Sequence, residues 1–203
     1  ITEEIVEIGM QYLEEQGYEV KMASGAEKNI LIDEVRDCDA ILVRTAKIGR
    51  EILEAGENLK VVAKHGVGLD NIDVEAATSL GIVVTNCPFS NKNSVAEHTI
   101  GLLLDLAKNT LIVDKGLRNG FYGIRDKVNG VELDGKVLGL IGLGSIGSLV
   151  AKKAYRGFNM KVVAYDPFVK QEDVINEVEL IDNWDSVFES ADFISLNLPS
   201  TAR

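Results

Sequence analysis

The sequence predicts an α/β protein with two doubly wound parallel sheets, and three observations lead to that prediction. Short runs rich in Val and Ile, such as "AILV" and "LKVVA", alternate with segments of helical periodicity. That alternation is typical of parallel strands whose two faces are both covered by helices. It is interrupted by a polar, glycine-rich stretch over 116–136 and then restarts. A chain of 203 residues is also long enough to bury the cores of two small domains.

The first domain is expected over residues 1–95. The pattern is helical from the first residue, with Ile1, Ile5, Ile8 and Tyr12 on one face. The elements expected after this helix are a strand at 18–23, a helix at 26–37, a strand at 39–45, a helix at 49–56, a strand at 59–66, a helix at 73–81 and a strand at 82–86. A helix between consecutive strands is the connection that parallel pairing needs.

The second domain is expected over residues 96–203, after a long helix that starts at Ser94. Ser94 and Glu97 have the spacing of a capping box, in which each side chain accepts from the other residue's amide. Past Thr99 the helix is apolar on most sides, which predicts that it is buried. An irregular arm at 116–136 should follow, then a strand at 137–141, a helix at 144–158, a strand at 161–165, a helix at 182–189 and a strand at 192–198.

Composition limits the classes of partner. The net charge of −11 opposes binding to nucleic acid and to anionic membrane surfaces. The longest apolar run falls short of the ~20 residues that span a bilayer, and the acidic start "ITEEIVEIGM" lacks a signal-peptide pattern. Cys38 and Cys87 stand far apart and suggest buried free thiols rather than a disulfide framework. We therefore expect a cytoplasmic protein.

The stretch "KVLGLIGLGSIGSLVAKKAYRGF" places a glycine turn between a buried strand and a helix. Gly142, Gly144 and Gly147 fit the spacing G-x-G-x-x-G: the first permits a tight turn, the second lets a pyrophosphate approach the main chain, and the third lets the helix pack closely. The loop residues Ser145 and Ile146 bring free amides to the start of the helix, where anions bind. A dinucleotide site is favoured over a purely structural turn.

An acidic residue follows the next expected strand. Asp166 in "VVAYDP" lies about 20 residues beyond the last glycine, where a carboxylate accepts hydrogen bonds from ribose hydroxyls. The same charge repels the extra phosphate of NADP, so the predicted cofactor is NAD. Pro167, next in the chain, is placed with it at the cofactor. The alternative is a structural Asp that caps a helix.

Three stretches carry a family resemblance: "LKVVAKHGVGLDNIDVEAATSLGIVVTN", "NKNSVAEHTIGLLLDLAKN" and "LDGKVLGLIGLGSIG". With them the chain resembles the NAD-dependent D-2-hydroxyacid dehydrogenases, most of all the members that oxidise 3-phosphoglycerate. The resemblance implies a flavodoxin-like substrate domain followed by a Rossmann dinucleotide-binding domain. It also implies that the first strand of the former and the C-terminal part of the latter lie outside these 203 residues.

The resemblance also implies a substrate site. Gly66, Val67 and Gly68 match the loop whose amides hold the substrate carboxylate, and such a concavity binds anions without a net charge. Arg44 matches a position that contacts the substrate, where a guanidinium could grip a carboxylate or phosphate. Lys64 and Asn91 match two further substrate-side positions. The alternatives are a surface salt bridge for Arg44, a loop role for Asn91 and a structural role for Lys64.

Further implications concern the cofactor and the catalytic groups. Pro199 matches a segment that lies along the cofactor, although Asn197 replaces the usual His two residues earlier. The family's catalytic His, Glu and Arg would lie downstream, so no catalytic residue is expected in this chain. His65 and His98 are interpreted as structural, and no spacing indicates a metal site.

The expected function is hydride transfer between nicotinamide and a small anionic 2-hydroxy or 2-oxo acid. A phosphorylated acid, hydroxypyruvate, glyoxylate and a bulkier oxo acid all stay open as substrates. A non-catalytic NAD-sensing module of the same fold is the alternative from another class. The arm at 116–136 resembles the family's dimerisation region, which implies a homodimer.

Overall fold

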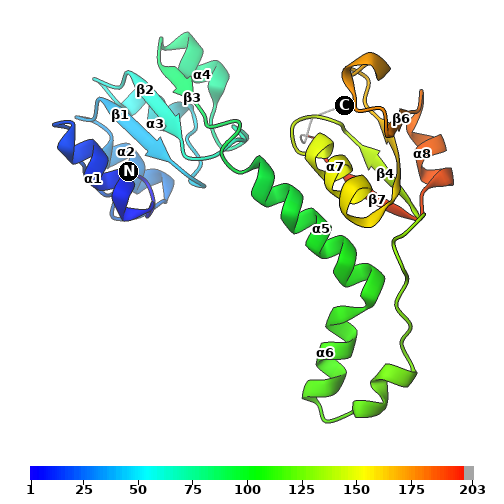
Figure 1. Ribbon diagram of the computed structural model, residues 1–203. Coiled ribbons are helices and arrows are strands. Elements are labelled where there is room, and N and C mark those ends of the chain that lie inside the picture. Colours follow the sequence, from blue (N-terminus) through cyan, green and yellow to red (C-terminus); the bar gives the residue numbers. More distant parts are fainter. Residues whose placement is uncertain (199–203) are drawn as a thin grey trace. The chain divides into compact units, whose positions relative to one another are not determined.

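A computed structural model describes residues 1–198 and divides the chain into two compact units (Figure 1). The first is Ile1–Asn91 and the second begins at Lys92, four residues before the boundary expected from the sequence. Each unit holds one parallel sheet, of three strands in the first and four in the second. The prediction of an α/β protein with two parallel sheets is confirmed.

The first unit alternates helices and strands around a sheet of order β1-β2-β3. Its elements are α1 (Glu7–Glu15), α2 (Lys28–Glu34), β1 (Ala40–Val43), α3 (Arg50–Ala55), β2 (Val61–Lys64), α4 (Val74–Ser79) and β3 (Val83–Thr85). Val43 and Val62 are fully buried in the sheet, and they pack with Ile52 and Leu53 of α3. Such a core fixes the carboxyl ends of β1 and β2, where the predicted substrate residues begin.

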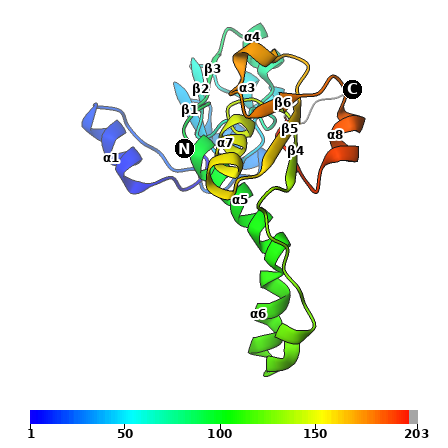
Figure 2. The same cartoon turned by 45° about the vertical axis from the view of Figure 1, so that its right-hand side comes forward.

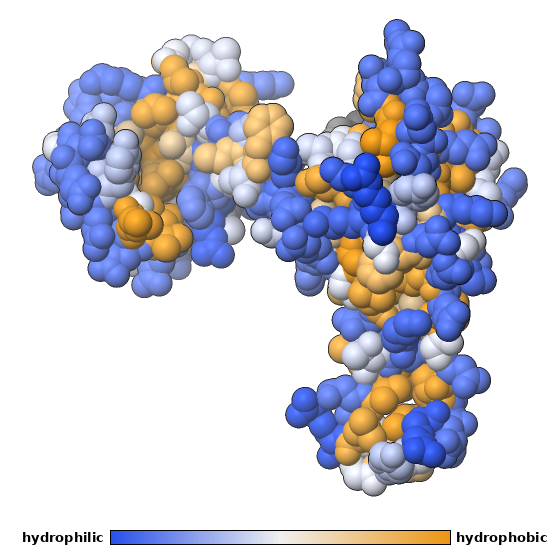
Figure 3. Space-filling view, in the orientation of Figure 1, coloured by the Kyte–Doolittle hydropathy of each residue, from blue (hydrophilic) through white to orange (hydrophobic). Residues whose placement is uncertain are grey.

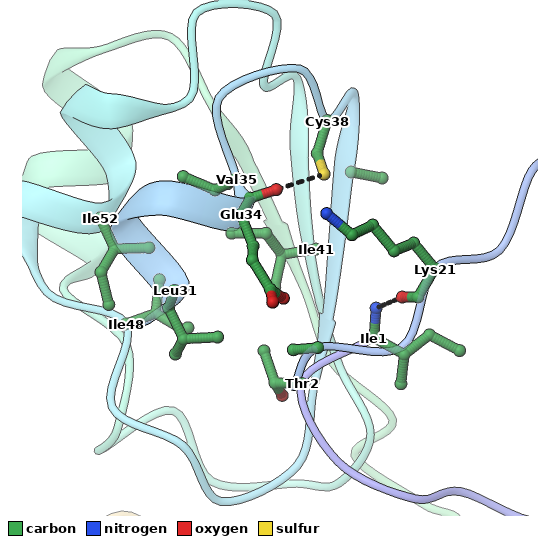
Figure 4. Close-up of a pocket in the computed structure, with 12 residues that line it drawn as sticks. Ile1, Thr2, Lys21, Leu31, Glu34, Val35, Cys38, Ile41, Ile48 and Ile52 are labelled. Atoms are coloured by element: carbon green, nitrogen blue, oxygen red, sulfur yellow. Dashed lines mark hydrogen bonds between the residues drawn. The ribbon is translucent and has the colours of Figure 1, made fainter. Parts of the chain in front are cut away.

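Residues 1–2 lie alongside β1 in an extended segment, so the expected helix does not start at the first residue. The Thr2 amide donates to the Leu42 carbonyl at 3.0 Å. On the other side, the Ile1 amine donates to the Lys21 carbonyl at 2.7 Å (Figure 4), and the Ala23 amide donates to the Ile1 carbonyl at 2.9 Å. Residues 1–2 therefore lie between residues 21–23 and β1. The order of these three segments in space, 21–23, then 1–2, then β1, differs from their order along the sequence, and this is the reversal of chain order at residues 1–2.

The expectations for residues 1–23 need two corrections. The stretch 18–23 forms no regular strand; its backbone bonds to this part of the sheet reach only Ile1. The first helix starts at Glu7, and Ile8 and Tyr12 are 72% and 61% exposed instead of buried. The apolar spacing starts at Ile1, but the hydrogen bond between Thr2 and Leu42 holds the first residues in an extended conformation, so the helix cannot include them. Figure 2 shows α1 standing away from the sheet of its unit.

An apolar hollow lies beside residues 1–2, between β1, α2 and residues 21–23 (Figure 4). Its empty volume is about 390 Å³, including solvent at the mouth. Leu31, Val35 and Ile41 are among its lining residues, and Cys38 donates from Sγ to the Glu34 carbonyl at 3.3 Å at its rim. None of the predicted substrate residues lines this hollow.

The second unit has strand order β6-β5-β4-β7, so the order reverses next to β4. Its elements are α5 (Lys92–Lys108), α6 (Thr110–Arg118), η1 (Tyr122–Asp126), β4 (Val137–Ile141), α7 (Gly147–Phe158), β5 (Lys161–Tyr165), η2 (Gln171–Asp173), β6 (Val178–Leu180), α8 (Trp184–Ser190) and β7 (Phe193–Leu196). Alternate strand residues face opposite sides. Leu138 and Leu140 pack with α7, whereas Ile141 packs with Val187 of α8.

The connection between the units corrects the expected helix start. Helix α5 begins at Lys92, so Ser94 lies inside it and does not cap it. Glu97 instead accepts from Asn93 Nδ2 at 2.8 Å and from Lys153 Nζ at 3.3 Å. The capping-box prediction is wrong because α5 already starts at Lys92, two residues before Ser94.

The arm is more regular than expected, and α5 is less buried. Asn109 adopts a left-handed conformation (φ 54°), and α6 starts directly after it. Leu102 and Leu106 of α5 are 55% and 69% exposed, so the helix is buried along one face only. Strand β6 was not anticipated, and Cys87 is exposed rather than buried. None of the helices within residues 1–198 is long and apolar enough to cross a bilayer.

Glu3 ties the N-terminal residues to the end of β1. Its carboxylate accepts from the amides of Thr45 at 2.6 Å, Ala46 at 2.7 Å and Arg44 at 3.0 Å, and from the hydroxyls of Thr2 and Thr45. Partial burial acts to raise the pKa of Glu3, but these hydrogen bonds outweigh it and lower the pKa to about 2. The carboxylate is therefore ionised wherever the protein is folded near neutral pH.

We expect Glu3→Gln to destabilise the first unit by about 1.5–3 kcal/mol at neutral pH, because an amide side chain replaces a charged acceptor. A lowered carboxyl pKa stabilises the fold above the ordinary value of 4.5, and that stabilisation is lost as the pH falls towards about 2. The difference between the two proteins should shrink over that window. Urea unfolding at several pH values, followed at the amide signals of β1 by NMR, measures it.

The matched control is Glu4→Gln, since Glu4 is the neighbouring acid and is exposed. Its effect on unfolding should stay within about 0.5 kcal/mol at every pH. A Glu3→Gln effect of constant size from neutral pH to pH 2 would contradict the role given to the ionised carboxylate.

Candidate functional site

The glycine turn joins β4 to α7, and two of its glycines are required by close contacts. Gly142 has φ +93°, and a Cβ there would lie 2.6 Å from the Asn197 carbonyl oxygen. A Cβ on Gly147, the first residue of α7, would lie 2.2 Å from the Gly142 carbonyl oxygen. Contacts this short with main-chain atoms exclude any side chain. The turn and the start of the helix therefore pack against each other as the sequence spacing predicts.

Gly144 differs from its two neighbours, because a Cβ built there meets no atom within 4 Å. Gly144 and Ser145 are exposed and Ile146 is half-buried. Within residues 1–198, the amides from Gly144 to Gly147 donate no hydrogen bond, as is usual where a helix starts, whereas the Ser148 amide donates to the Gly144 carbonyl at 3.0 Å. The surface of the turn is thus bare main chain with free donors at 144–147. A pyrophosphate fits such a surface in both shape and charge.

Asp166 lies immediately after β5 and turns back to the glycine turn. Its Oδ2 accepts from the Leu143 amide at 2.8 Å, and its Oδ1 accepts from the Phe168 amide at 2.9 Å. Asp166 is half-buried, and the next residue, Pro167, is exposed. Neither bond caps a helix, since both partners belong to loops. The structure therefore brings the acid and the glycine turn together, as expected.

The segment after β7 lies on the other side of the turn. The Asn197 amide donates to the Ile141 carbonyl at 2.8 Å, and its side chain reaches Ser195 Oγ at 3.1 Å. Asn197 is thereby fixed beside Gly142, whose space its carbonyl limits. Pro199, predicted to lie along the cofactor, is outside the described residues.

The substrate loop follows β2 in the first unit. Gly66 has φ +153°, and its amide already donates to the Lys64 carbonyl at 2.9 Å. The carbonyls of Gly66 and Val67 accept from the Cys87 amide at 2.9 Å and from Asn86 Nδ2 at 2.7 Å. No hydrogen bond within residues 1–198 occupies the amides of Val67 and Gly68. Two of the three predicted residues thus offer an amide to an anion, and Gly66 shapes the loop.

Arg44 is exposed at the end of β1, next to the strand that leads into this loop. In the part of the chain that is described, its guanidinium takes part in no ion pair. The surface salt bridge considered as an alternative is therefore not formed here. The side chain is available for an anionic ligand.

Lys64 is half-buried and contacts the main chain of Arg44. Its Nζ donates to the Arg44 carbonyl at 2.6 Å and to Asn71 Oδ1. Asn71 in turn donates from Nδ2 to the Ala46 carbonyl at 2.6 Å. The ammonium group is thus used within the protein, which favours the structural alternative for Lys64.

The other candidates are not brought into this cluster. Asn91 is exposed at the last position of the first unit, and no hydrogen bond links it to Arg44 or to the loop. His65 and His98 are both exposed. Residues 1–198 contain no group of three or more side chains that could hold a metal ion.

Two residues of the cluster were missed from the sequence. Glu3 lies in an acidic start, "ITEEIVE", where no spacing separates it from its neighbours. Asn71 follows the loop in "GLDNID" without a motif of its own. Their partners are main-chain groups far away in the sequence, and such contacts leave no local pattern.

Comparison with known proteins shows which family the chain is similar to. The family described as D-isomer specific 2-hydroxyacid dehydrogenase, catalytic domain, matches residues 1–194. A D-3-phosphoglycerate dehydrogenase of Methanocaldococcus jannaschii is 42% identical over 205 residues, which cover 100% of this chain and 38% of the relative. A hydroxypyruvate reductase of Thermotoga maritima is 44% identical over 176 residues, which cover 86% and 56%.

One solved structure is similar to this chain in fold and in sequence. The NAD⁺-bound 3-phosphoglycerate dehydrogenase of Entamoeba histolytica superimposes with a TM-score of 0.74 and 37% identity, covering 94% of this chain and 57% of that one. The chain thus spans little more than a third of the M. jannaschii relative's length and under two thirds of the other two. The family match over residues 1–194 places this chain among the D-isomer specific 2-hydroxyacid dehydrogenases.

Proposed function

We propose that this chain binds the cofactor and the substrate of an NAD-dependent oxidoreductase acting on a D-2-hydroxy acid and its 2-oxo acid. The observation that carries the proposal is the bare main chain at Gly144, with open space above it and Asp166 beside the turn. That combination suits the pyrophosphate and the ribose of NAD. Two of the relatives described above are named as 3-phosphoglycerate dehydrogenases, and they suggest this activity.

In this proposal the second unit binds the cofactor and the first unit binds the substrate. The second unit is the Rossmann dinucleotide-binding domain, because its glycine turn lies at the carboxyl end of β4, where the strand order reverses towards β7. The first is the flavodoxin-like substrate domain. The reversal of chain order at residues 1–2 supports it.

The chain's residues hold and orient the reacting groups. NAD, when bound, supplies or accepts the hydride at C4 of its nicotinamide ring. The amides from Gly144 to Gly147 would hold the pyrophosphate, and Asp166 would accept the ribose hydroxyls. In the first unit, the amides of Val67 and Gly68 would hold the substrate carboxylate, and Arg44 would bind a second anionic or carbonyl oxygen. We assign no acid–base step to residues 1–198.

The class of substrate that we propose follows from the Arg44 guanidinium, which is available for an anionic group. Arg44 makes no ion pair in the described residues, and two free amides already suit one carboxylate. A second anionic group on the substrate, such as a phosphate, would use the guanidinium. We therefore propose 3-phosphoglycerate as the substrate. The second candidate is hydroxypyruvate, favoured by the Thermotoga maritima relative.

The arm at 116–136, together with helix α6 that leads into it, supports a homodimer as the partner proposal. Leu111 and Ile112 of α6 are 71% and 53% exposed, and Phe121 and Tyr122 of the next turn are 43% and 67% exposed. Figure 3 shows apolar side chains gathered on this arm. An apolar surface of this kind marks a protein interface. We propose that the same surface of a second copy covers it.

We expect Asp166→Ala to weaken NADH binding by about tenfold and to reduce the preference for NADH over NADPH, because the loss of the carboxylate removes both the ribose acceptor and the repulsion of the 2′-phosphate. Fluorescence titration of the chain with each cofactor measures both effects. Unchanged affinities would remove the ribose assignment.

The matched control for Asp166→Ala is Gly144→Ala. A methyl group there enters open space, so unfolding should be unaffected. It would stand where the pyrophosphate binds, so affinity for NADH and NADPH should fall by the same factor. An affinity unaffected by Gly144→Ala would contradict the cofactor site as a whole.

We expect Arg44→Ala to weaken binding of 3-phospho-D-glycerate by at least about tenfold, the loss typical of a charged hydrogen-bond partner. NMR titration of the chain with 3-phospho-D-glycerate and with D-glycerate measures the contribution of the phosphate. Arg50→Ala is the control, because Arg50 is exposed nearby in sequence and pairs, among residues 1–198, with Glu54 at 3.3 Å. Equal affinity for the two acids would favour the hydroxypyruvate alternative.

We expect the chain to sediment as a dimer and Leu111→Glu to sediment as a monomer, because a charge buried in an apolar interface is costly. Tyr12→Glu is the control, since Tyr12 is also exposed but belongs to α1. Sedimentation equilibrium measures both variants. A monomeric unaltered chain would exclude the dimer.

A further inference from the structure

The main chain of Arg44 is held by charged groups from two distant parts of the chain. Its amide donates to the Glu3 carboxylate at 3.0 Å, and its carbonyl accepts from Lys64 Nζ at 2.6 Å. Strand pairing cannot serve these two groups, because β1 ends one residue earlier, at Val43. An anion and a cation thus replace the neighbouring strands at the point where the predicted substrate arginine leaves the sheet.

Glu3 fixes more than one peptide. It also accepts from the amides of Thr45 and Ala46, so that three successive N–H groups converge on one carboxylate. Three successive amides directed at one anion leave the segment little freedom to rotate. Both oxygens of Glu3 are occupied in this way, and Glu3 forms no ion pair with the Arg44 guanidinium.

Lys64 fixes the same segment from β2. Its second partner is Asn71, which donates to the Ala46 carbonyl at 2.6 Å. The ammonium is therefore bound to neutral oxygens and leaves any anionic ligand to Arg44. Glu3 and Lys64 both bind main-chain groups of this segment, whereas Arg44 is exposed and its guanidinium forms no ion pair within the described part of the chain.

We propose that Glu3 and Lys64 are positioning residues that hold the backbone of Arg44 so that its guanidinium is presented to an anionic group of the substrate. The inference rests on the proposed function, since it takes Arg44 as a substrate contact. An arginine on a free loop would lose its side-chain and main-chain freedom on binding, which costs affinity. A backbone fixed in advance avoids part of that cost.

The test is a double-mutant cycle on binding of 3-phospho-D-glycerate to the 203-residue chain, by NMR titration. Glu3→Gln removes the charge while keeping the side-chain shape, and Lys64→Met removes the ammonium. Each should weaken binding by about tenfold, within the range for coupled neighbours. Glu4→Gln and Lys60→Met are the controls, because Glu4 is exposed and the side chain of Lys60 pairs, in the described part of the chain, with Asp39 at 2.6 Å.

The decisive variants combine these changes with Arg44→Ala. If Glu3 and Lys64 act through Arg44, neither substitution should weaken binding further in that background, beyond about twofold. A purely structural role would lower affinity equally with and without Arg44, and that result overturns the inference. If Glu3→Gln fails to fold, Lys64→Met and Thr45→Val, which removes one bond to Glu3, provide the same comparison.

The outcomes separate this inference from the proposed function. If Arg44→Ala weakens binding but Glu3→Gln and Lys64→Met do not, only the positioning role is overturned. If the unaltered chain does not bind 3-phospho-D-glycerate, or if Arg44→Ala leaves its affinity unchanged, the substrate site is overturned and the positioning role with it.

Discussion

Main-chain N–H groups without a partner at the ends of parallel strands are the feature on which both candidate sites depend. Within residues 1–198, these are the amides from Gly144 to Gly147 in the second unit and those of Val67 and Gly68 in the first. Each set stays free because a glycine keeps side chains away or turns the chain out of the sheet, as Gly66 does with φ +153°. The α/β fold places such groups at the carboxyl ends of its strands. The anion binding that we propose therefore relies mainly on the backbone, and few side chains are needed to tune it.

The cofactor half of the site was predictable because its determinants are local. The ranges predicted for the strands 137–141 and 161–165 coincide with β4 and β5. Gly142 and Gly147 lie where close main-chain contacts leave no room for a side chain, Gly144 borders open space, and Asp166 lies against the turn. Strand, turn, helix and strand follow one another within 30 residues, so each contact joins near neighbours in sequence. Where contacts join near neighbours in this way, hydrophobic periodicity and glycine spacing are sufficient to predict the local structure.

The predictions that failed depend on contacts between distant residues. The helix expected from Ile1 starts six residues later, because Thr2 bonds to Leu42 and Glu3 to the end of β1. The cap at Ser94 is absent because α5 starts earlier, and α6 was missed because a single left-handed residue, Asn109, separates two helical segments. Lys64 lies next to Arg44, but its ammonium group donates to the main-chain carbonyl of Arg44. No pattern in a short window distinguishes a lysine that binds a ligand from one that binds a carbonyl.

A net charge of −11 raises the question of how this chain would attract anionic ligands. Coulomb repulsion from distant surface acids is screened within about 10 Å at ordinary salt, so the local groups decide. The Glu3 carboxylate, which contacts the Arg44 segment, accepts from amides that offset its charge, and Lys64 binds the carbonyl of the same peptide whose N–H bonds to Glu3. The acid therefore organises the Arg44 segment without cancelling the guanidinium. A neutral residue at position 3 would lower the negative charge and still present a poorer anion site, because the donor geometry would be lost.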